Sequence, residues 1–442
     1  MVSSASSPSG LSALGSYTLR KARWRLLPIL GLLYFVAFLD RNNVGFAKLT
    51  MSEDIGLSAA AYGFGAGVFF IGYALAEIPS NGGMYRYGAR KWIARILVSW
   101  GIIATLMFLV NNEVTFSIAR FLLGAAEGGF FPAVVFYLTL WFPSRERVTV
   151  LALFILAQPI SNAIGAPLSG WILNMEGVAG LHGWQWLFIL QGIPAIVLGI
   201  LAPWLLTDRP DDAKWLASEE RAWLVKTMQD DQAGRTPRSH RFRDGLKDPR
   251  AFAYAFLNFG MVCGIYGFGL WLPTIMAALG KFDNVQLGFL VMIPYAFAAV
   301  FLYYWARRAD RTGKRAVHAS ISMVIAAVGL LGAGFTLNVS PLVAMFFLVI
   351  AAMGVYSATA PLLSMPSAAF SGAIAAAALA LVNAIGNVGG FVAPYIVGLI
   401  NQATGNDRVS LVFLAAVLIV TAIATYLYAR KRPEGDVLRA FE

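Results

Sequence analysis

The sequence predicts an all-α integral membrane protein with twelve transmembrane helices in two pseudo-symmetric bundles of six. Three observations predict this class: an apolar composition, twelve long apolar segments, and one long hydrophilic segment that divides them evenly. Hydrophobic residues make up 58% of the chain and charged residues only 13%, against about a quarter in ordinary globular proteins. A soluble fold could not hide that much apolar surface, whereas lipid removes the need to hide it.

About 20 apolar residues cross the hydrocarbon core as one helix, and the chain contains twelve segments of roughly that length. The fifth and the eleventh are rich in Gly, Ala and Pro and give the weakest helical signal. We expect the spans near residues 26–47, 60–80, 92–111, 115–138, 149–173, 185–206, 251–277, 286–306, 316–337, 341–363, 372–401 and 409–429.

The basic residues predict the orientation. When the N-terminus is placed inside, 29 of the 34 Lys and Arg residues fall in cytoplasmic segments, Arg41 and Arg120 fall within spans, and only Lys48, Lys281 and Arg408 fall in external loops. This bias follows the positive-inside rule. We therefore expect a multi-pass protein of a bacterial-type inner membrane with both termini in the cytoplasm.

The long hydrophilic segment sets the domain boundaries. It contains a helical-looking run, Ala217–Met228, and we interpret it as a solvated linker; a role in binding DNA or a partner is the alternative. The expected parts are a disordered cytoplasmic tail (1–24), a first six-helix bundle (25–206), the linker (207–249), a second bundle (250–430) and a C-terminal cytoplasmic tail (431–442).

Cysteine and histidine give no sign of a metal centre. Cys263 is the single cysteine, and the three histidines lie far apart without metal-ligand spacing. No phosphate-binding loop or nucleophile motif appears in any loop. We expect no metal and no cofactor, which disfavours a membrane-embedded enzyme or a sensor. The net charge of +11 resides in short loops between apolar segments, so we expect no nucleic-acid partner.

An internal repeat relates the two bundles. The loop after the second span, Arg86-Tyr87-Gly88-Ala89-Arg90, and the loop after the eighth, Arg311-Thr312-Gly313-Lys314-Arg315, share an Arg-x-Gly-x-Arg pattern 225 residues apart. Duplicated halves are typical of secondary transporters, whose substrate site lies between the repeats near the membrane midplane.

These two loops resemble the signature of the major facilitator superfamily, which occurs once in each half. The second copy has the usual aspartate, Asp310, whereas Tyr85 stands in its place in the first. The resemblance implies the fold of that superfamily and a gating role for both loops, with a weakened charge relay in the first half. The gating candidates in the loops are Arg86, Gly88, Arg90, Asp310, Arg311, Gly313 and Arg315.

Other motifs resemble the anion:cation symporter family, which includes the bacterial galactonate transporter and animal sialin. They cover nearly the whole chain and comprise Phe38–Lys48, Glu77–Asn81, Gly88–Arg95, Arg120-x-x-x-Gly124-x-x-Glu127-x-Gly129-x-x-Pro132, Trp184-x-Trp186-x-Phe188, Leu206–Pro210 and Asn383-x-x-Gly386-Asn387-x-Gly389-Gly390. Within the family the pattern is most similar to bacterial carriers of tartrate, phthalate and hydroxyphenylacetate. The resemblance implies proton-coupled uptake of a small organic anion by alternating access.

Four charged residues lie well inside predicted spans, where each costs roughly 2.5–3.5 kcal/mol on insertion scales and faces the bundle interior. At about 1.5 Å per residue, Asp40, Arg41 and Arg120 lie at similar depths, and Glu127 lies roughly 10 Å deeper, near the midplane. We therefore expect Asp40 to pair with Arg120, leaving Glu127 without a fixed partner, where desolvation favours its protonated form. The alternative is that all four form fixed ion pairs that brace the bundle.

The resemblance assigns roles to these charges. It implies proton coupling at Glu127, and we add Asp40 as a second candidate. It also implies that Arg41 binds the substrate carboxylate, a task that suits a permanently charged guanidinium able to donate two hydrogen bonds. Arg120 is a further candidate for the anion.

Polar side chains on other spans are candidates for the lining of a substrate site. Gln158 and Asn162 are four residues apart, and so are Asn383 and Asn387, on repeat-related spans. Either pair could instead bond neighbouring helices.

Tyr34 and Tyr73 could donate hydroxyls to substrate, and Glu77 is interpreted either as a cytoplasmic gate or as a packing ion pair. The second half has no charge inside a span, so it can recognise hydroxyls or a ring but cannot neutralise a carboxylate. Its polar and aromatic candidates are Tyr266, Trp271, Tyr295, Ser357, Thr359 and Ser364.

The expected partners are a small organic anion, a proton and membrane lipid, and we expect a monomer. A proton-coupled exporter is the alternative function. Such exporters usually have a Gly-rich motif in the fifth span, of which this chain has only Gly165-x-Pro167-x-x-Gly170.

Overall fold

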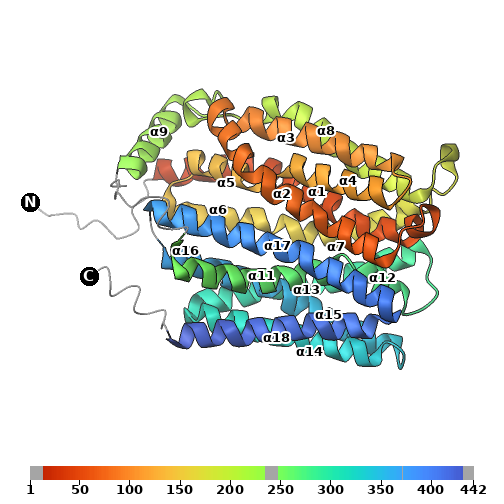
Figure 1. Cartoon of the computed structure of the whole chain (residues 1–442). Coiled ribbons are helices and arrows are strands. Elements are labelled where there is room, and N and C mark those ends of the chain that lie inside the picture. The colour runs from red at the N-terminus through yellow and green to blue at the C-terminus, as the bar shows by residue number, and fades with distance from the viewer. Residues whose placement is uncertain (1–12, 234–246, 371, 432–442) are drawn as a thin grey trace, which may run out of the picture.

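The computed structural model describes residues 13–233, 247–370 and 372–431. Within these ranges it is helical with no strand, and twelve segments are long and apolar enough to cross a membrane. The helices lie side by side along one direction, and α1 begins at the end of the bundle where α18 ends (Figure 1). We call this the terminal end and the opposite one the distal end. The prediction of twelve transmembrane helices in an all-α membrane protein is confirmed.

The first half spans α1 to α8, with one short 3₁₀ turn between α3 and α4 and another between α7 and α8. Its helices are α1 (Ala13–Asp54), α2 (Ala59–Tyr87), α3 (Ala89–Leu106), α4 (Glu113–Glu127), α5 (Phe130–Trp141), α6 (Ser144–Ile155), α7 (Ala157–Leu173) and α8 (Gly183–Leu205). The connecting segment contains α9 (Ser218–Ala233), which agrees with the predicted helical run.

The second half has the same organisation. Its helices are α11 (Pro249–Gly269), α12 (Leu272–Ala277), α13 (Asn284–Thr312), α14 (Arg315–Thr336), α15 (Pro341–Ser357), α16 (Thr359–Ala369), α17 (Gly372–Thr404) and α18 (Asp407–Lys431). Three short 3₁₀ turns complete the first half and the linker: η1 (Met107–Leu109), η2 (Val178–Gly180) and η3 (Pro210–Asp212).

The fourth span is broken directly after Glu127. Helix α4 ends there, Gly128 is extended in ψ, and Gly129 adopts a left-handed conformation with φ 92° before α5 begins. A Cβ on Gly129 would lie 2.1 Å from the hydroxyl oxygen of Ser80 on α2. Only glycine satisfies both demands, so the sequence itself fixes a helix end at the deepest acid of the first half.

Gly129→Ala is therefore expected to destabilise the protein. The left-handed conformation costs about 1–2 kcal/mol for a residue with a Cβ, and the contact with Ser80 adds to it. Gly31→Ala is the matched control, because its Cβ would meet nothing within 4 Å. We expect the melting temperature of the purified protein to fall for Gly129→Ala and to stay the same or rise slightly for Gly31→Ala, because alanine is the better helix former; equal melting temperatures would contradict this account of the break.

Helix α1 is longer than its predicted span. At 42 residues and 1.5 Å per residue it extends well beyond a 30 Å hydrocarbon core. Residues 13–24, which we predicted to belong to a disordered tail, form its first turns, and this part of the prediction is wrong. The rest of that tail and residues 432–442 of the C-terminal tail lie outside the described residues.

Contacts with the linker explain why the start of α1 is helical. Lys21 Nζ forms an ion pair with Glu220 on α9 at 2.8 Å, and Gly15 faces the indole of Trp223. Helix α9 is also tied to the first half by Arg147 and Asp231, 3.1 Å apart. The linker thus packs on the terminal end of the first bundle.

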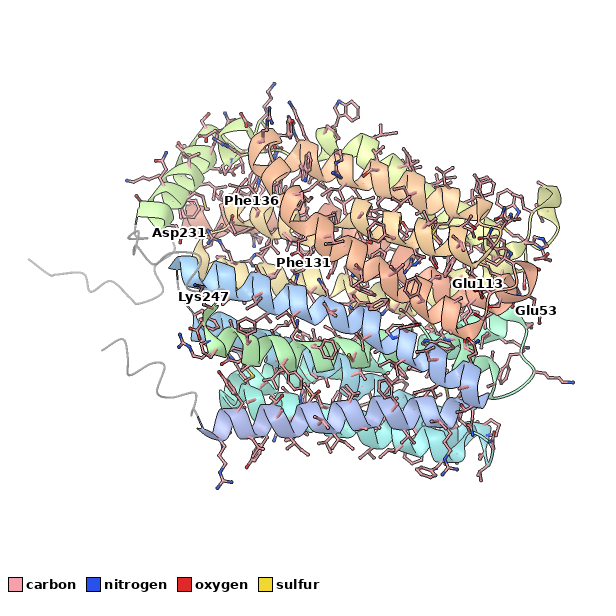
Figure 2. All side chains as sticks on the ribbon, in the orientation of Figure 1. Glu53, Glu113, Phe131, Phe136, Asp231 and Lys247 are labelled. Atoms are coloured by element: carbon pink, nitrogen blue, oxygen red, sulfur yellow. The ribbon has the colours of Figure 1, made fainter. Side chains whose placement is uncertain are left out.

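Most charged side chains lie at the two ends of the bundle, and the side chains between the ends are mainly apolar. Glu53 and Glu113 lie at the distal end, and Asp231 and Lys247 at the terminal end (Figure 2). This distribution is the one that a lipid bilayer requires.

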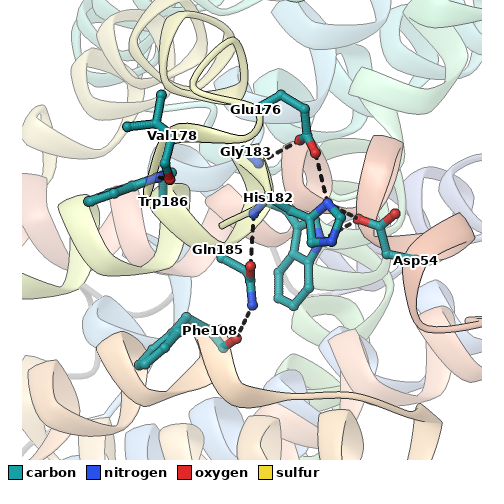
Figure 3. Close-up of polar contacts among 9 residues, drawn as sticks. Asp54, Phe108, Glu176, Val178, His182, Gly183, Gln185 and Trp186 are labelled. Atoms are coloured by element: carbon teal, nitrogen blue, oxygen red, sulfur yellow. Dashed lines mark hydrogen bonds and ion pairs between the residues drawn. The ribbon is translucent and has the colours of Figure 1, made fainter. Parts of the chain in front are cut away.

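A polar cluster fixes the distal loop between α7 and α8 to the end of α1. His182 Nδ1 lies 2.7 Å from Glu176 Oε1 and 3.4 Å from Asp54 Oδ2 (Figure 3). Glu176 also accepts the Gly183 backbone N–H at 2.7 Å, and this bond lowers the pKa of the Glu176 carboxyl. The indole N–H of Trp184 donates to Asp54 at 2.6 Å. The cluster caps the first turn of α8 and anchors both elements within the first half.

The two halves meet along three helix pairs: α1 with α12, α2 with α17, and α7 with α13. Glycines allow the backbones to approach, as in other membrane helix packings. A Cβ on Gly67 would lie 2.7 Å from the Phe391 carbonyl of α17, and a Cβ on Gly170 would lie 2.1 Å from that of Asn284 in α13. The halves are therefore closed against each other at the distal end of this seam.

Candidate functional site

A buried ion pair joins the first and fourth spans. The guanidinium of Arg41 on α1 donates from Nη2 to Glu127 Oε1 at the end of α4. Only 11% of the Arg41 side chain and 2% of the Glu127 side chain are exposed. Glu127 lies 14 residues from the distal start of α4, and Arg41 lies 13 residues from the distal end of α1, so at 1.5 Å per residue both are about 20 Å from the distal ends of their helices. The expectation that Glu127 has no fixed partner is wrong.

Arg41 also contacts the second half. Its Nη1 donates to the phenol oxygen of Tyr266 on α11 at 3.0 Å. Aromatic rings surround the rest of the guanidinium, with ring centroids of Phe38, Phe69 and Tyr73 at 4.8, 5.2 and 5.5 Å. Arg41 is thus held by a carboxylate of one half, by a hydroxyl of the other and by cation–π contacts.

Asp40 and Arg120 do not form the predicted ion pair. Asp40 is 1% exposed and accepts the indole N–H of Trp100 on α3 at 2.7 Å. Arg120 is fully buried, lies over the ring of Phe69 at 4.8 Å and donates to the Ala66 carbonyl at 3.4 Å. Consecutive helical residues point about 100° apart, so Asp40 turns towards α3 while Arg41 turns towards Glu127.

Several buried polar atoms of Asp40 and Arg120 remain without a hydrogen-bond partner among the described residues. Asp40 Oδ1 and the Nε and Nη1 atoms of Arg120 make no hydrogen bond within the described part of the chain. A buried charge without full pairing is costly, and such groups in a membrane protein usually mark a functional site. Two arginines and two acids therefore share the first half's interior, with a single ion pair between them.

A chain of polar groups crosses the seam beside Arg41. Asn42 donates to Asn162 Oδ1 on α7 at 2.6 Å, and Asn162 donates to the phenol of Tyr356 on α15 at 3.4 Å. Tyr295 on α13 continues the chain and donates to the Gly269 carbonyl at 3.3 Å. A cavity of about 20 Å³ lies along this chain, enough for a water molecule. Asn162 is thus found at the interface of the halves.

The candidate gate residue Glu77 contacts the second half directly. Asn383 Nδ2 on α17 donates to its two carboxylate oxygens at 3.2 and 3.4 Å. This contact joins α2 to α17 on the terminal side of Glu127. The bond uses Asn383 as a link between helices, which is the alternative that its spacing left open.

The other lining candidates are less involved in polar contacts. The ring of Tyr34 stacks on Phe154 at 4.3 Å, within the first half. Tyr73 contributes its ring to the Arg41 surroundings. Gln158 and Asn387 are half-buried, and their side chains make no hydrogen bond to described residues.

The two basic loops form matching turns. Gly88 and Gly313 both have positive φ, 85° and 68°, so each copy of the repeat needs its glycine. In the first copy Arg90 forms an ion pair with Asp208 at 2.9 Å, and its backbone N–H donates to the same carboxylate. Asp208, at the end of the first bundle, thus provides a carboxylate next to a loop that has Tyr85 where aspartate is usual.

The second copy has looser contacts. Asp310 and Arg311 are exposed, and Arg315 donates to the Ser364 carbonyl at 3.5 Å. In the first copy Arg86 lies over the ring of Tyr87 at 5.4 Å. Both loops lie at the terminal end.

Three contributors to the site were not identified from the sequence. Trp100 binds Asp40, Asn42 binds Asn162, and Tyr356 binds Asn162. Tryptophan and tyrosine are abundant in the spans, so composition gives no reason to single these two out. Asn42 directly follows Arg41, and its position within a charged stretch of α1 was a signal that could have identified it.

The fold and the site define a class: a membrane transporter built from two helical halves, with buried charges at the seam. Comparisons with known proteins agree. The model of the family described as Major Facilitator Superfamily matches residues 30–281 and 272–442. The chain belongs to the major facilitator superfamily, and its members are transporters and not enzymes.

Several relatives match over nearly the whole chain. A protein of Agrobacterium vitis named "Putative tartrate transporter" is 46% identical, with 94% of this chain and 92% of that protein covered. The "Quinolone resistance transporter" of Acinetobacter baumannii is 42% identical, with 93% and 95% covered. The "Putative metabolite transport protein NicT" of Pseudomonas putida is 38% identical, with 91% and 92% covered.

Solved structures support the fold. The xylose transporter XylE of E. coli in a partially occluded inward-open conformation has a TM-score of 0.74 at 14% identity, with 93% of this chain and 98% of that chain covered. A bacterial homologue of the lysosomal transporter Spinster in an inward-facing conformation has a TM-score of 0.72 at 17% identity, with 95% and 98% covered. The predicted fold of two six-helix bundles is confirmed.

Proposed function

We propose that this protein imports a small organic anion together with a proton, by alternating access. The observation that carries the proposal is the buried pair of Arg41 and Glu127, which also touches the second half through Tyr266. Arg41 is the group suited to hold a carboxylate. Glu127 occupies the same guanidinium in the empty protein, so substrate and Glu127 compete for it.

This competition explains coupling by charge balance. Without substrate, Arg41 and ionised Glu127 sum to zero. With one carboxylate on Arg41, the sum returns to zero only when Glu127 carries a proton. The second carboxylate of a dianion such as tartrate is balanced by a proton on Asp40. Each uncompensated charge costs roughly 2.5–3.5 kcal/mol in the membrane interior. The halves therefore close over the empty pair, or over anion and proton together, and not over either one alone.

The neighbouring residues take supporting roles in this proposal. Asp40 is a second proton site, and Arg120 compensates its charge at a distance. Tyr73, Gln158, Asn162, Asn383 and Asn387 offer hydrogen bonds to the anion as the halves move. Glu77 with Asn383, together with the basic loops around Gly88 and Gly313, acts as the terminal-side gate.

The substrate class and the topology are part of the proposal. The relative named for tartrate suggests a hydroxylated carboxylate, and the tyrosines of the second half suit its hydroxyls. The excess of Lys and Arg at the terminal end supports cytoplasmic termini in a bacterial inner membrane. We propose a monomer, surrounded by lipid.

Right-side-out membrane vesicles test this function. With the outside acidified, labelled L-tartrate or another small carboxylate should accumulate, and a protonophore should abolish the accumulation. Accumulation that does not depend on the imposed pH gradient would contradict proton coupling.

Export is the second candidate, because the relative named for quinolone resistance is 42% identical. Inverted vesicles distinguish the two. An exporter would load labelled quinolone into inverted vesicles with an acidic lumen, whereas the proposed importer would not.

A further inference from the structure

Lys48 is a second cation on the face of α1 that carries Arg41. The two residues are seven apart, which is close to two helical turns, so both point to the same side. At about 1.5 Å per residue, Lys48 lies roughly 10 Å nearer the distal end. The two cations therefore lie one behind the other along the seam, with Lys48 nearer the distal end and Arg41 deeper.

The ammonium of Lys48 is enclosed by aromatic rings from both halves. Its Nζ lies 4.2 Å from the ring centroid of Trp271 and 5.1 Å from that of Tyr62. These two rings meet edge to face at 5.1 Å, and both side chains are fully buried. The cage is complete only because α1 and α2 of the first half meet the α11–α12 junction of the second.

The polar partner of this ammonium is uncharged. Nζ donates to the Thr274 hydroxyl at 3.1 Å, and no carboxylate of the described residues forms an ion pair with it. Asp407, at the start of α18, is the acid whose field reaches Lys48, and it accepts a hydrogen bond from Asn401 at 2.5 Å. A partly buried cation without an acidic partner is costly, so the cation–π contacts with Trp271 and Tyr62 and the bond to Thr274 are what stabilise the ammonium in the closed state.

The contacts of Lys48 across the seam exist only while the distal end is closed. Trp271 and Thr274 belong to the second half, and Tyr62 donates to the Leu270 carbonyl of the same junction at 2.8 Å. When the halves separate here, the ammonium keeps Tyr62, loses Trp271 and Thr274, and faces the aqueous mouth. An exposed ammonium without a carboxylate partner attracts anions.

We propose that Lys48 is an outer docking site for the substrate carboxylate and that its aromatic cage is the latch of the closed distal gate. A carboxylate on Lys48 neutralises the ammonium and withdraws it from Trp271, because a cation–π contact needs the charge. The gate therefore closes once the anion has moved on to Arg41. This inference rests on the proposed function for its substrate and for the outward position of the distal end.

The test combines transport with a reporter that needs no substrate. Lys48→Met keeps the length of the side chain and removes the charge, Lys48→Arg keeps the charge, and Lys281→Met removes an exposed charge in the distal loop after α12.

The reporter is Ser169→Cys in a Cys263→Ser background. Ser169 is 2% exposed and lines the seam cavity, so an impermeant maleimide applied from outside labels it only when the distal end opens.

We expect Lys48→Met to increase the labelling rate roughly tenfold, the effect of losing one desolvated cation–π contact. The KM for L-tartrate in right-side-out vesicles should rise by a similar factor, with kcat less affected. Lys48→Arg should restore both values towards those of the unaltered protein, and Lys281→Met should change neither.

An unchanged KM in a protein that transports L-tartrate would overturn the docking site, and unchanged labelling would overturn the latch. If the unaltered protein moves no L-tartrate, the proposed function is what fails. In that case the inference is tested by the labelling rates alone, and equal rates for Lys48→Met and Lys281→Met would contradict it.

Discussion

Glu127→Gln is expected to abolish proton-driven accumulation of the anion while substrate exchange continues. Glutamine is neutral, like protonated Glu127, so Arg41 stays available to a carboxylate at every pH. The site is then balanced only with the anion bound, and the empty carrier keeps an uncompensated Arg41, which blocks its return. Counterflow of labelled against unlabelled L-tartrate needs only the loaded carrier and should remain within about twofold, while accumulation under an acid-outside gradient should disappear.

Glu53→Gln is the matched control for this variant. Glu53 is exposed at the distal surface (Figure 2), away from the ion pair, and its loss should leave both activities unchanged. Gradient-driven accumulation that persists in Glu127→Gln would refute the role of this carboxylate in coupling. Loss of counterflow together with a normal melting temperature would instead make Glu127 part of anion binding.

Arg41→Lys is expected to reduce transport severely although the charge is kept. The guanidinium reaches Glu127 and Tyr266 with two different nitrogens, and an ammonium cannot reproduce that geometry. Hydrogen bonds to charged groups contribute about 1.5–3 kcal/mol each, so the KM for the anion should rise by about ten- to a hundredfold. Initial uptake rates over a range of L-tartrate concentrations provide the measurement.

Arg408→Lys provides the comparison for this substitution. Arg408 lies at the distal surface over the ring of Phe335 at 4.1 Å, and its replacement should not affect KM. Uptake by Arg41→Lys with an unaltered KM would show that the carboxylate binds elsewhere. A Tyr266→Phe variant separates the two contacts, because it removes the bond to the second half and leaves the pair with Glu127.

The helices could be predicted because lipid imposes a simple rule on composition. Twelve apolar segments, a hydrophilic linker and the Lys and Arg distribution sufficed for the number of spans and their division into halves. The prediction failed at the start of α1, where residues 13–24 are ordered by contacts with α9. Such contacts between distant segments leave no local pattern, so a Ser-, Ala- and Gly-rich start indicated only a tail.

The members of the site could be predicted, but their pairing could not. Charges inside a span identify Asp40, Arg41, Arg120 and Glu127, and helical rise gives their depths. Depth does not determine which helix each side chain faces. Asp40 faces Trp100 of α3, and Arg41 lies level with Glu127 because α1 continues to Asp54. The predicted first span ended at residue 47, seven residues earlier, and so underestimated the depth of Arg41.

A carboxylate that comes from a distant part of the chain is equally hard to predict. The first basic loop lacks its usual aspartate at Tyr85, which predicted a weakened charge relay. Asp208, 123 residues later in the chain, forms the ion pair with Arg90. Only the packing of the end of α8 beside the α2–α3 turn brings the two together.

Proton uptake on anion binding tests the central claim most directly. Purified protein in a weakly buffered solution with a pH-sensitive dye should take up about two protons for each L-tartrate dianion bound, because one carboxylate displaces Glu127 from Arg41, Glu127 must then be neutralised, and Asp40 balances the second carboxylate. Glu127→Gln should bind the anion with about one proton fewer. Binding without proton uptake in the unaltered protein, or equal uptake in Glu127→Gln, would contradict the competition for Arg41.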